Sequence, residues 1–232
     1  MIKKEYKTVP LTHIQKIIGK RMLESKKTKP CFYIELNADV SYLMKYRTSL
    51  RKGIGVKITT NTFYLHAIGF AAAKFPLMLA SFAGDTIKIP DSVNIGFAVS
   101  APHGLVVPVI KNIQDKNITQ IAIEENDLTE KARNNSLAFD DMQGENIAVS
   151  NLGPYGIDSF IAIVPPHASS IIAIGNVDRR VTIVDNRPDV ARKVSLTLAA
   201  DNRVVTPVYA AKFLTCIKQL LENPQSLVED DA

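Results

Sequence analysis

The spacing of apolar residues along the chain predicts five helices. The first begins after Thr12, a plausible N-cap, and ends before Pro30. Its apolar face is formed by Leu11, Ile14, Ile17, Ile18 and Met22. The second begins at about Asp39 and extends to about Arg51. The remaining three cover residues 60–75, 119–133 and 207–222.

These last three helices differ in which faces are apolar. Residues 60–75 are rich in alanine and apolar on most sides, which predicts a buried helix. In residues 119–133 we expect Ile121, Leu128 and Ala132 to point inward. Residues 207–222 have proline in the first turn, where its missing N–H costs no helical hydrogen bond.

Alternation of apolar and polar residues predicts strands between the helices. Phe32, Ile34, Leu36, Ala38 and Val40 alternate with more polar neighbours, as in a strand with one buried face. Seven further strand-like segments, bounded by Gly, Pro, Asn and Asp, are at about 93–100, 105–110, 146–150, 159–164, 170–174, 180–185 and 193–199. Because strands and helices do not alternate strictly, a doubly wound parallel sheet is not expected. We predict one two-layer α/β (α+β) domain over residues 1–232, with residues 1–10 as an N-terminal arm.

Composition is consistent with a soluble intracellular domain. The chain has 232 residues, of which 46% are hydrophobic, enough for a sizeable core. Two cysteines, Cys31 and Cys216, are too few for a disulfide framework. No apolar run reaches the roughly 20 residues that cross a bilayer, and the N-terminus lacks a secretory pattern. We therefore expect the cytoplasm or the mitochondrial matrix.

Positive charge is concentrated near the N-terminus. The chain has a net charge of +5, and nine of its basic residues lie between Lys3 and Lys29. Such a run usually forms a solvated helix face; the alternative is attraction of an anionic cofactor or an acidic protein surface. The basic residues are not interleaved with aromatics, so a nucleic-acid-binding module has little support. A basic module that binds a membrane surface is a further alternative with equally little support.

Several catalytic motifs are absent. The chain has no Gly-x-Gly-x-x-Gly, Walker A loop, Gly-x-Ser-x-Gly elbow or His-Glu-x-x-His. Its four histidines lack metal-ligand spacing, so no metal site is predicted. His66 lies in the buried helix and is expected to be a core or interface residue, and His13 a surface residue. His103 and His167 lie in proline-containing loops and are the two histidines with catalytic potential.

Five segments, in order and at compatible spacing, resemble the catalytic domain of the dihydrolipoamide acyltransferases, the core components of 2-oxo acid dehydrogenase complexes. The most distinctive is Ser150-Asn151-Leu152-Gly153 with its continuation to Gly175. The others are residues 11–26, 30–33, 93–110 and 203–224. The resemblance covers nearly the whole chain. It implies a chloramphenicol-acetyltransferase-like domain that forms a homotrimer, with active sites between subunits.

The resemblance also implies partners and substrates. In this family trimers associate into larger hollow cores, and an acyl group passes between coenzyme A and lipoamide, which act as substrates. Other subunits of the dehydrogenase complex are possible partners. The 232 residues contain no lipoyl domain and no subunit-binding domain.

The resemblance assigns site residues by position. The reaction needs a base to deprotonate a thiol with a pKa near 8.5 and a hydroxyl to stabilise the oxyanion. Ser150 matches the oxyanion-stabilising serine, although a strand-end serine can also cap the following turn. Arg203 matches the arginine of the family's His-Arg-x-x-Asp-Gly motif. Asn202 stands at the position of the catalytic histidine and Thr206 at that of the aspartate.

Three other positions also carry a residue that differs from the one usual in the family. Cys31 follows Pro30 where the family usually has histidine, and His167 stands where it usually has glutamine. Leu79 occupies an expected asparagine position. A carboxamide does not exchange protons near pH 7. The pattern therefore favours a catalytically impaired core subunit, a pseudoenzyme, with Cys31 and His167 along the former substrate channel.

An active enzyme with a rearranged site is the main alternative. Cys31 would then accept the acyl group, or His167 or His103 would act as a displaced base. Against this, a free cysteine is more often a small, buried apolar residue than a nucleophile.

Overall fold

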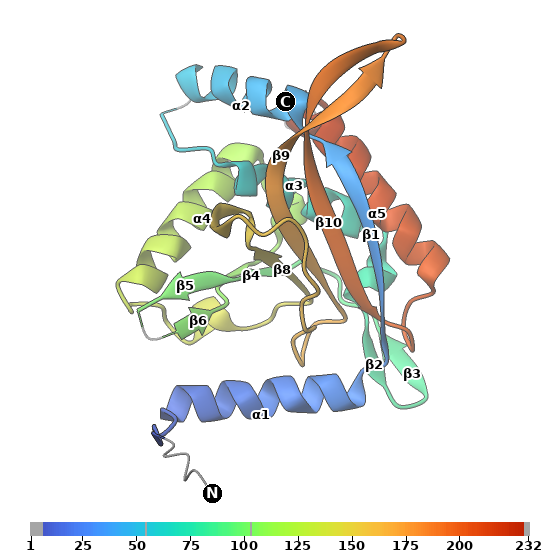
Figure 1. Ribbon diagram of the computed structural model, residues 1–232. Helices are drawn as coiled ribbons and strands as arrows, with labels where there is room; N and C mark the ends of the chain where they lie inside the picture. The colour runs from blue at the N-terminus through green and yellow to red at the C-terminus, as the bar shows by residue number, and fades with distance from the viewer. Residues whose placement is uncertain (1–6, 54, 103, 230–232) are drawn as a thin grey trace, which may run out of the picture.

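A mixed six-stranded sheet forms the centre of the molecule (Figure 1). The structure, a computed structural model, describes residues 7–53, 55–102 and 104–229. The strands run in the order β1 (Cys31–Asp39), β10 (Arg187–Asp201), β9 (Ser170–Val184), β8 (Ile147–Asn151), β4 (Ile95–Phe97) and β7 (Val109–Ile110). The pairs β4–β8 and β8–β9 are parallel and the other three are antiparallel, so the sheet is not doubly wound. Two small hairpins accompany it, β2 (Ser81–Ala83) with β3 (Thr86–Lys88) and β5 (Val99–Ala101) with β6 (Gly104–Val106).

Helices cover one face of this sheet. They are α2 (Ser41–Gly53), α3 (Thr60–Lys74), α4 (Ile118–Arg133) and α5 (Pro207–Glu222), followed by the short α6 (Ser226–Glu229). Four short 3-10 turns lie at Pro76–Leu79, Ile113–Asp115, Asp140–Met142 and Gly153–Tyr155. Helix α5 lies along β1 and β10, and α3 packs between α5 and α4 (Figure 1). The main core fills the space between sheet and helices, and Phe63, Leu198 and Phe213 are fully buried in it. The two-layer arrangement predicted from the sequence is confirmed.

Helix α1 (His13–Thr28) lies apart from these helices, below the sheet in Figure 1. Thr12 and Gln15 form a capping box at its start, as the N-cap prediction required. Of its predicted apolar face, Ile17 is 40% exposed, Ile18 and Met22 are half-buried, and none of the three belongs to the hydrophobic core. Its basic side chains from Lys16 to Lys27 are exposed, as in a solvated face.

The expected strand at 159–164 is wrong. Residues 157–168 form no strand and cross the sheet without a backbone ladder. Val164 and Ala168 are nevertheless buried against Ala148, Ile171 and Ala199 of the sheet. The run of apolar residues at 160–164 had suggested a strand, but an irregular segment can pack on a sheet face without joining its backbone ladder.

Other strand boundaries also differ from the expectations. The segments at 170–174 and 180–185 belong to one continuous strand, β9, which pairs with β10 in a long hairpin projecting beyond α2 (Figure 1). The segments at 93–100 and 105–110 each divide into two short strands. The hairpin at residues 81–88 was not predicted. The five predicted helices are all present, within two residues of the expected bounds at most ends.

None of the helices in the described part of the chain has the length and apolar character that crossing a bilayer needs.

Candidate functional site

The C-terminal end of β10 brings several predicted site residues to one corner of the sheet. Asp201 is the last residue of β10 and lies opposite Cys31 of β1. The backbone N–H of Asn202 donates to the carbonyl of Pro30 at 3.1 Å. The N–H groups of Val204 and Val205 then bond to the Asp201 carbonyl, which closes the turn toward α5. Cys31, Asn202 and Arg203 therefore share this corner.

Arg203 is held by a carboxylate of its own turn. Its Nε lies 3.0 Å from Asp201 Oδ1 and its Nη2 2.6 Å from Oδ2, a bidentate pair. The Asp201 side chain is 3% exposed and that of Arg203 30%. The guanidinium also lies 4.2 Å from the centre of the Phe82 ring. Asp201 was not among the predicted site residues, although it stands next to the motif that drew attention to Asn202.

Asn202 and Thr206 take different places around this turn. Asn202 is exposed. Thr206 is the N-cap of α5, and its hydroxyl oxygen accepts from the N–H of Tyr209 at 3.3 Å. The cap explains why a hydroxyl residue suits position 206 without any role in acyl transfer.

Cys31 is half-buried and lines a small cavity under the end of α1. Its neighbours there include Ser25, Lys29, Tyr33 and Val164. Burial raises the pKa of the Cys31 thiol, and the nearby Asp201 carboxylate raises it further, against the opposing effect of Lys29. The thiol is thus held in its protonated, poorly nucleophilic form near neutral pH.

Lys29 attaches the loop that carries His167 to this corner. Its Nζ donates to the carbonyls of Pro165 and Pro166, both at 2.8 Å, and to that of Ala168. Burial lowers the pKa of the Lys29 ammonium, although Asp201 acts in the opposite direction. His167 is exposed on this loop. Sequence reasoning counted Lys29 among the surface charges, and only its position directly before Pro30 set it apart.

Ser150 lies elsewhere on the sheet. It is half-buried in β8, opposite Ala173 of β9, which in turn pairs with Thr197 of β10. Asn202 follows five residues after Thr197, so the strand rise and strand spacing separate Ser150 from Asn202 by roughly 20 Å. The structure therefore does not bring Ser150 together with Asn202, Arg203 and Thr206 in one chain.

The turn after Ser150 is tightly packed against β9. The carboxamide oxygen of Asn151 accepts from the N–H of Gly153 at 3.0 Å, so Asn151 makes the turn cap that the sequence suggested for Ser150. A Cβ on Gly153 would lie 2.5 Å from the Gly175 carbonyl oxygen, and one on Gly175 would lie 1.8 Å from that of Asp158. Both glycines are needed for this close backbone approach.

The structure places neither His66 nor His103 at this corner. His66 is buried in α3 as expected, and His103 lies outside the described residues. Among the described residues no cluster of His, Cys, Asp and Glu could hold a metal ion.

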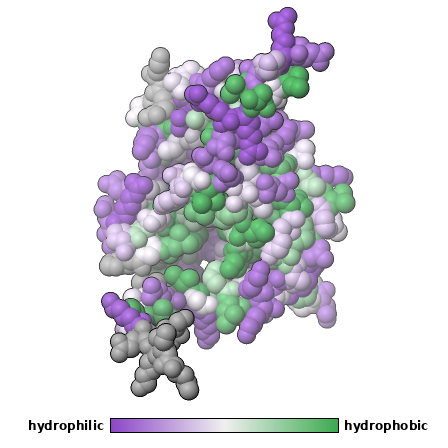
Figure 2. All heavy atoms as spheres, in the orientation of Figure 1, coloured by the Kyte–Doolittle hydropathy of each residue, from purple (hydrophilic) through white to green (hydrophobic). Residues whose placement is uncertain are grey.

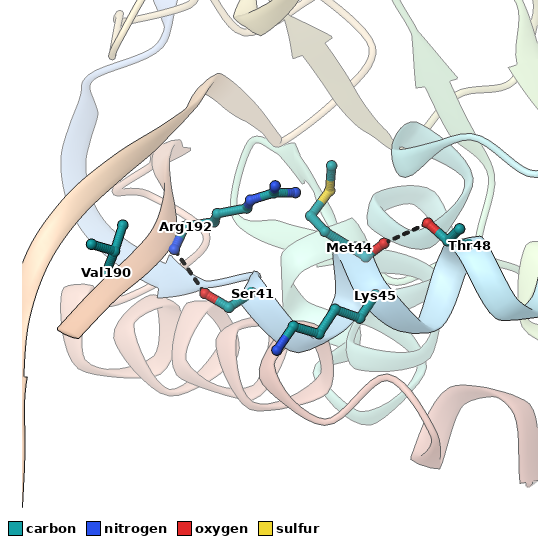
Figure 3. A pocket seen from close by; sticks show the side chains of 6 residues that line it. All are labelled: Ser41, Met44, Lys45, Thr48, Val190 and Arg192. Atoms are coloured by element: carbon teal, nitrogen blue, oxygen red, sulfur yellow. Dashed lines mark hydrogen bonds between the residues drawn. The ribbon is translucent and has the colours of Figure 1, made fainter.

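A surface groove of about 500 Å³ lies far from these residues, between α2 and the projecting hairpin (Figure 3). Its hydroxyl groups serve the backbone: the Ser41 oxygen accepts from the N–H of Arg192 at 2.7 Å, and Thr48 donates to the Met44 carbonyl at 3.0 Å. Lys45 and Arg192 supply positive charge there, and none of the groove residues suits acyl transfer.

Comparison with known proteins gives a consistent result. Residues 3–229 match the family described as 2-oxoacid dehydrogenases acyltransferase (catalytic domain). The pyruvate dehydrogenase acetyltransferase component of Rickettsia bellii is 38% identical over 224 residues, which are 95% of this chain and 54% of that protein. The chain thus spans about half the length of the curated relatives it matches.

Solved structures agree with the sequence match. The dihydrolipoamide acetyltransferase of Azotobacter vinelandii, studied for catalytic roles of a serine, a histidine and an asparagine, gives a TM-score of 0.91 at 29% identity, covering 97% of this chain and 95% of that one. The cubic core of a pyruvate dehydrogenase multienzyme complex gives 0.91 at 30% identity, with the same coverage. A chloramphenicol acetyltransferase, at 10% identity and a TM-score of 0.57 over 87% of this chain and 94% of that one, shares the fold alone.

Proposed function

The chain belongs to the family of 2-oxoacid dehydrogenase acyltransferase catalytic domains, and we propose that it is a core subunit in which acyl transfer between dihydrolipoamide and coenzyme A is strongly impaired. Its main role is then structural: it supports assembly of the core. Residues 1–232 act as one domain in this proposal, with residues 1–10 as an N-terminal arm.

The observation that carries the proposal is the residue at position 202. The family resemblance places the catalytic base there, directly after the last residue of β10. A carboxamide can donate and accept hydrogen bonds but cannot take a proton from a thiol near pH 7. Loss of a positioned base lowers a rate by about 10² to 10⁴.

The surroundings of Asn202 support the same reading. Thr206, at the expected aspartate position, uses its hydroxyl oxygen to cap α5. Arg203 pairs with Asp201, which keeps the turn ordered without a base. The frame of the site is thus preserved by contacts that need no catalytic chemistry.

The separation of Ser150 from Asn202 supports assembly. Two groups roughly 20 Å apart in one chain, by strand rise and spacing, meet only when each comes from a different copy. Sites between subunits are what the resemblance implies for a homotrimer. We propose such a trimer, and its association into a larger core with other complex subunits, on the analogy of the cubic core to which the chain is similar.

One observation favours the alternative of an active enzyme with a rearranged site. His167 lies on the loop that Lys29 ties to the Cys31 corner, beside the position where the family base would stand. His167 would then act as a displaced base. The raised pKa of Cys31 argues against that thiol as an acyl acceptor.

The test is acyl transfer from acetyl-, succinyl- and branched acyl-coenzyme A to dihydrolipoamide, for the natural chain and for Asn202→His/Thr206→Asp. We expect a silent natural chain and a gain of at least about 10² in the double variant. Adding Ser150→Ala to the double variant should remove most of the gain. A natural chain as active as the double variant would overturn the proposal, and His167→Ala would then test the alternative.

The same preparation tests assembly and the minor binding alternative. Light scattering coupled to gel filtration should give a trimer or a larger particle, and a monomer would contradict the proposed assembly. Binding of nucleic acid or membranes that persists at high salt would support the alternative of a basic binding module. Attraction by charge alone is screened under those conditions.

A further inference from the structure

Helix α4 places a carboxylate deep in the helical layer, where the acyl-transfer site does not use it. The Glu125 residue is 6% exposed. It accepts hydrogen bonds from the first turn of α3 and its cap: Thr62 Oγ1 at 2.5 Å, Asn61 Nδ2 at 3.1 Å and Thr59 Oγ1 at 3.1 Å. A buried carboxylate with this many donors is held in one orientation.

Asn61 links the Glu125 carboxylate to the sheet through two hydrogen bonds. Its amide nitrogen donates to Glu125, and its carbonyl oxygen Oδ1 accepts from Nδ2 of Asn151 at 3.3 Å. The side-chain oxygen Oδ1 of Asn151 in turn accepts from the backbone N–H of Gly153 at 3.0 Å. An unbroken chain of side-chain hydrogen bonds therefore runs from Glu125 in α4, through Asn61 in α3, to the turn that ends β8.

The end of this chain is adjacent to Ser150. Successive side chains of a strand point to opposite faces, so Asn151 points toward the helices while Ser150 points to the opposite face of the sheet. Fixing the Asn151 side chain and the Gly153 N–H fixes the backbone on which the Ser150 hydroxyl is mounted. The packing of Gly153 against Gly175 leaves little space for an alternative turn.

We propose that Glu125 and Asn61 are positioning residues for the Ser150 hydroxyl: they act through Asn151 and hold the end of β8 in the orientation in which Ser150 can donate to an oxyanion. This inference rests on the proposed function for the role of Ser150, but the structural link itself does not. Neither residue touches substrate.

Charge supports the assignment. Burial raises the pKa of the Glu125 carboxyl, while the hydrogen bonds from Thr62, Asn61 and Thr59, and more weakly the charge of Lys57, act in the opposite direction. An apolar residue at position 125 would leave the buried donors Thr62, Asn61 and Thr59 without their acceptor. One of these donors, Asn61, also accepts a hydrogen bond from Asn151 at the end of β8.

The direct test is amide hydrogen exchange at Gly153, which needs no catalytic activity. In Asn61→Ala we expect amide exchange at Gly153 to accelerate about fivefold to tenfold, because the Asn151 side chain loses the hydrogen bond that holds it. The Leu152 amide, which bonds to the Ile174 carbonyl at 3.1 Å, serves as a reference inside the same turn and should change little. Glu125→Ala should behave like Asn61→Ala, and the conservative Glu125→Gln should restore slow exchange.

Thr62→Val is the matched control. It removes a donor to the same carboxylate and weakens the α3 capping box, but leaves the Asn61 bonds to Glu125 and Asn151 in place. It should lower global stability with less than about a twofold effect on Gly153. Equal acceleration in Thr62→Val and Asn61→Ala, or none in Asn61→Ala, would overturn the positioning role.

Activity separates this inference from the proposed function. In the Asn202→His/Thr206→Asp background, Asn61→Ala should lower kcat with KM unchanged, because the oxyanion forms only in the transition state. An unchanged kcat despite faster Gly153 exchange would overturn the link to Ser150. If the double variant stays silent, the proposed function has failed, and the exchange rates still decide whether Glu125 and Asn61 position the turn.

Discussion

The guanidinium of Arg203 folds back onto the carboxylate of Asp201, two residues earlier, and lies over the ring of Phe82. This contact joins the end of β10 to the β2–β3 hairpin and makes Asn202 the exposed residue between two paired charges. These contacts hold the turn without using the side chain at position 202.

Arg203→Ala should destabilise the fold by about 2 kcal/mol, because it leaves the Asp201 carboxylate buried without its cation. The partial exposure of the guanidinium keeps the loss below that of a fully buried pair. Urea unfolding measures it. Arg203→Lys, which keeps the charge but not the bidentate geometry, should recover only part. A loss within error of zero for Arg203→Ala would contradict a structural role for the pair.

Lys29→Met should release the loop at residues 165–168. The ammonium satisfies three carbonyl oxygens there, and hydrogen bonds from a charged group are worth about 2 kcal/mol together once solvent competes. Limited proteolysis of the loop should accelerate. Lys27→Met removes an exposed charge from the same run and should leave cleavage unchanged. Equal protection of both variants would show that the loop is held by apolar packing alone.

Stability should depend on pH through Glu125. Its pKa is raised in the folded state, so between the unfolded and the folded pKa the native protein binds more protons, and stability falls as pH rises through that window. Glu125→Gln does not titrate. The Tm of the variant minus that of the natural chain should therefore increase from about pH 4 toward neutrality. A difference that decreases instead would mean that the hydrogen bonds outweigh burial.

Cys31 should react slowly with iodoacetamide. Its raised pKa lowers the thiolate fraction near pH 8, so alkylation should lag behind a free thiol such as N-acetylcysteine and reach its half-maximal rate at higher pH. Mass spectrometry of the tryptic peptide gives the rate. Fast modification at pH 7 would instead support an activated cysteine and the rearranged-site alternative.

Thr206→Asp should preserve stability while Thr206→Ala should cost about 1 kcal/mol, because aspartate replaces threonine as an N-cap and alanine does not. Thermal unfolding of both variants makes the comparison. The result bears on the activity test, since a destabilised Thr206→Asp would leave the double variant unable to report on the missing base.

The helices were predictable because their caps and periodicity are local. Thr12 caps α1 and Pro207 opens α5 in the structure as in the sequence. The strand expected at 159–164 is absent because a run of apolar residues indicates burial, here of Val164, but not whether the backbone pairs with a neighbouring strand. The long β9 was divided because Gly175, Asn176 and Asp178 in its middle are residue types that usually separate strands.

The site was predictable only where a motif marked it. Ser150, Asn202, Arg203 and Thr206 were identified by resemblance, and their positions at two ends of the sheet follow from strand register, which the sequence does not show. Lys29 and Glu125 were missed because each looked like an ordinary helix charge. Their importance comes from carbonyls and hydroxyls distant in sequence.

The distance between Ser150 and Asn202 has a stoichiometric consequence if this chain ever shares a trimer with a competent relative. Each copy of this chain would contribute Ser150 to one shared site and Asn202, which cannot act as a base, to another. One copy would thus silence one site of three without harming the site that borrows its serine. Output would fall in proportion to the fraction of this chain, a graded control on flux set by expression rather than by a ligand.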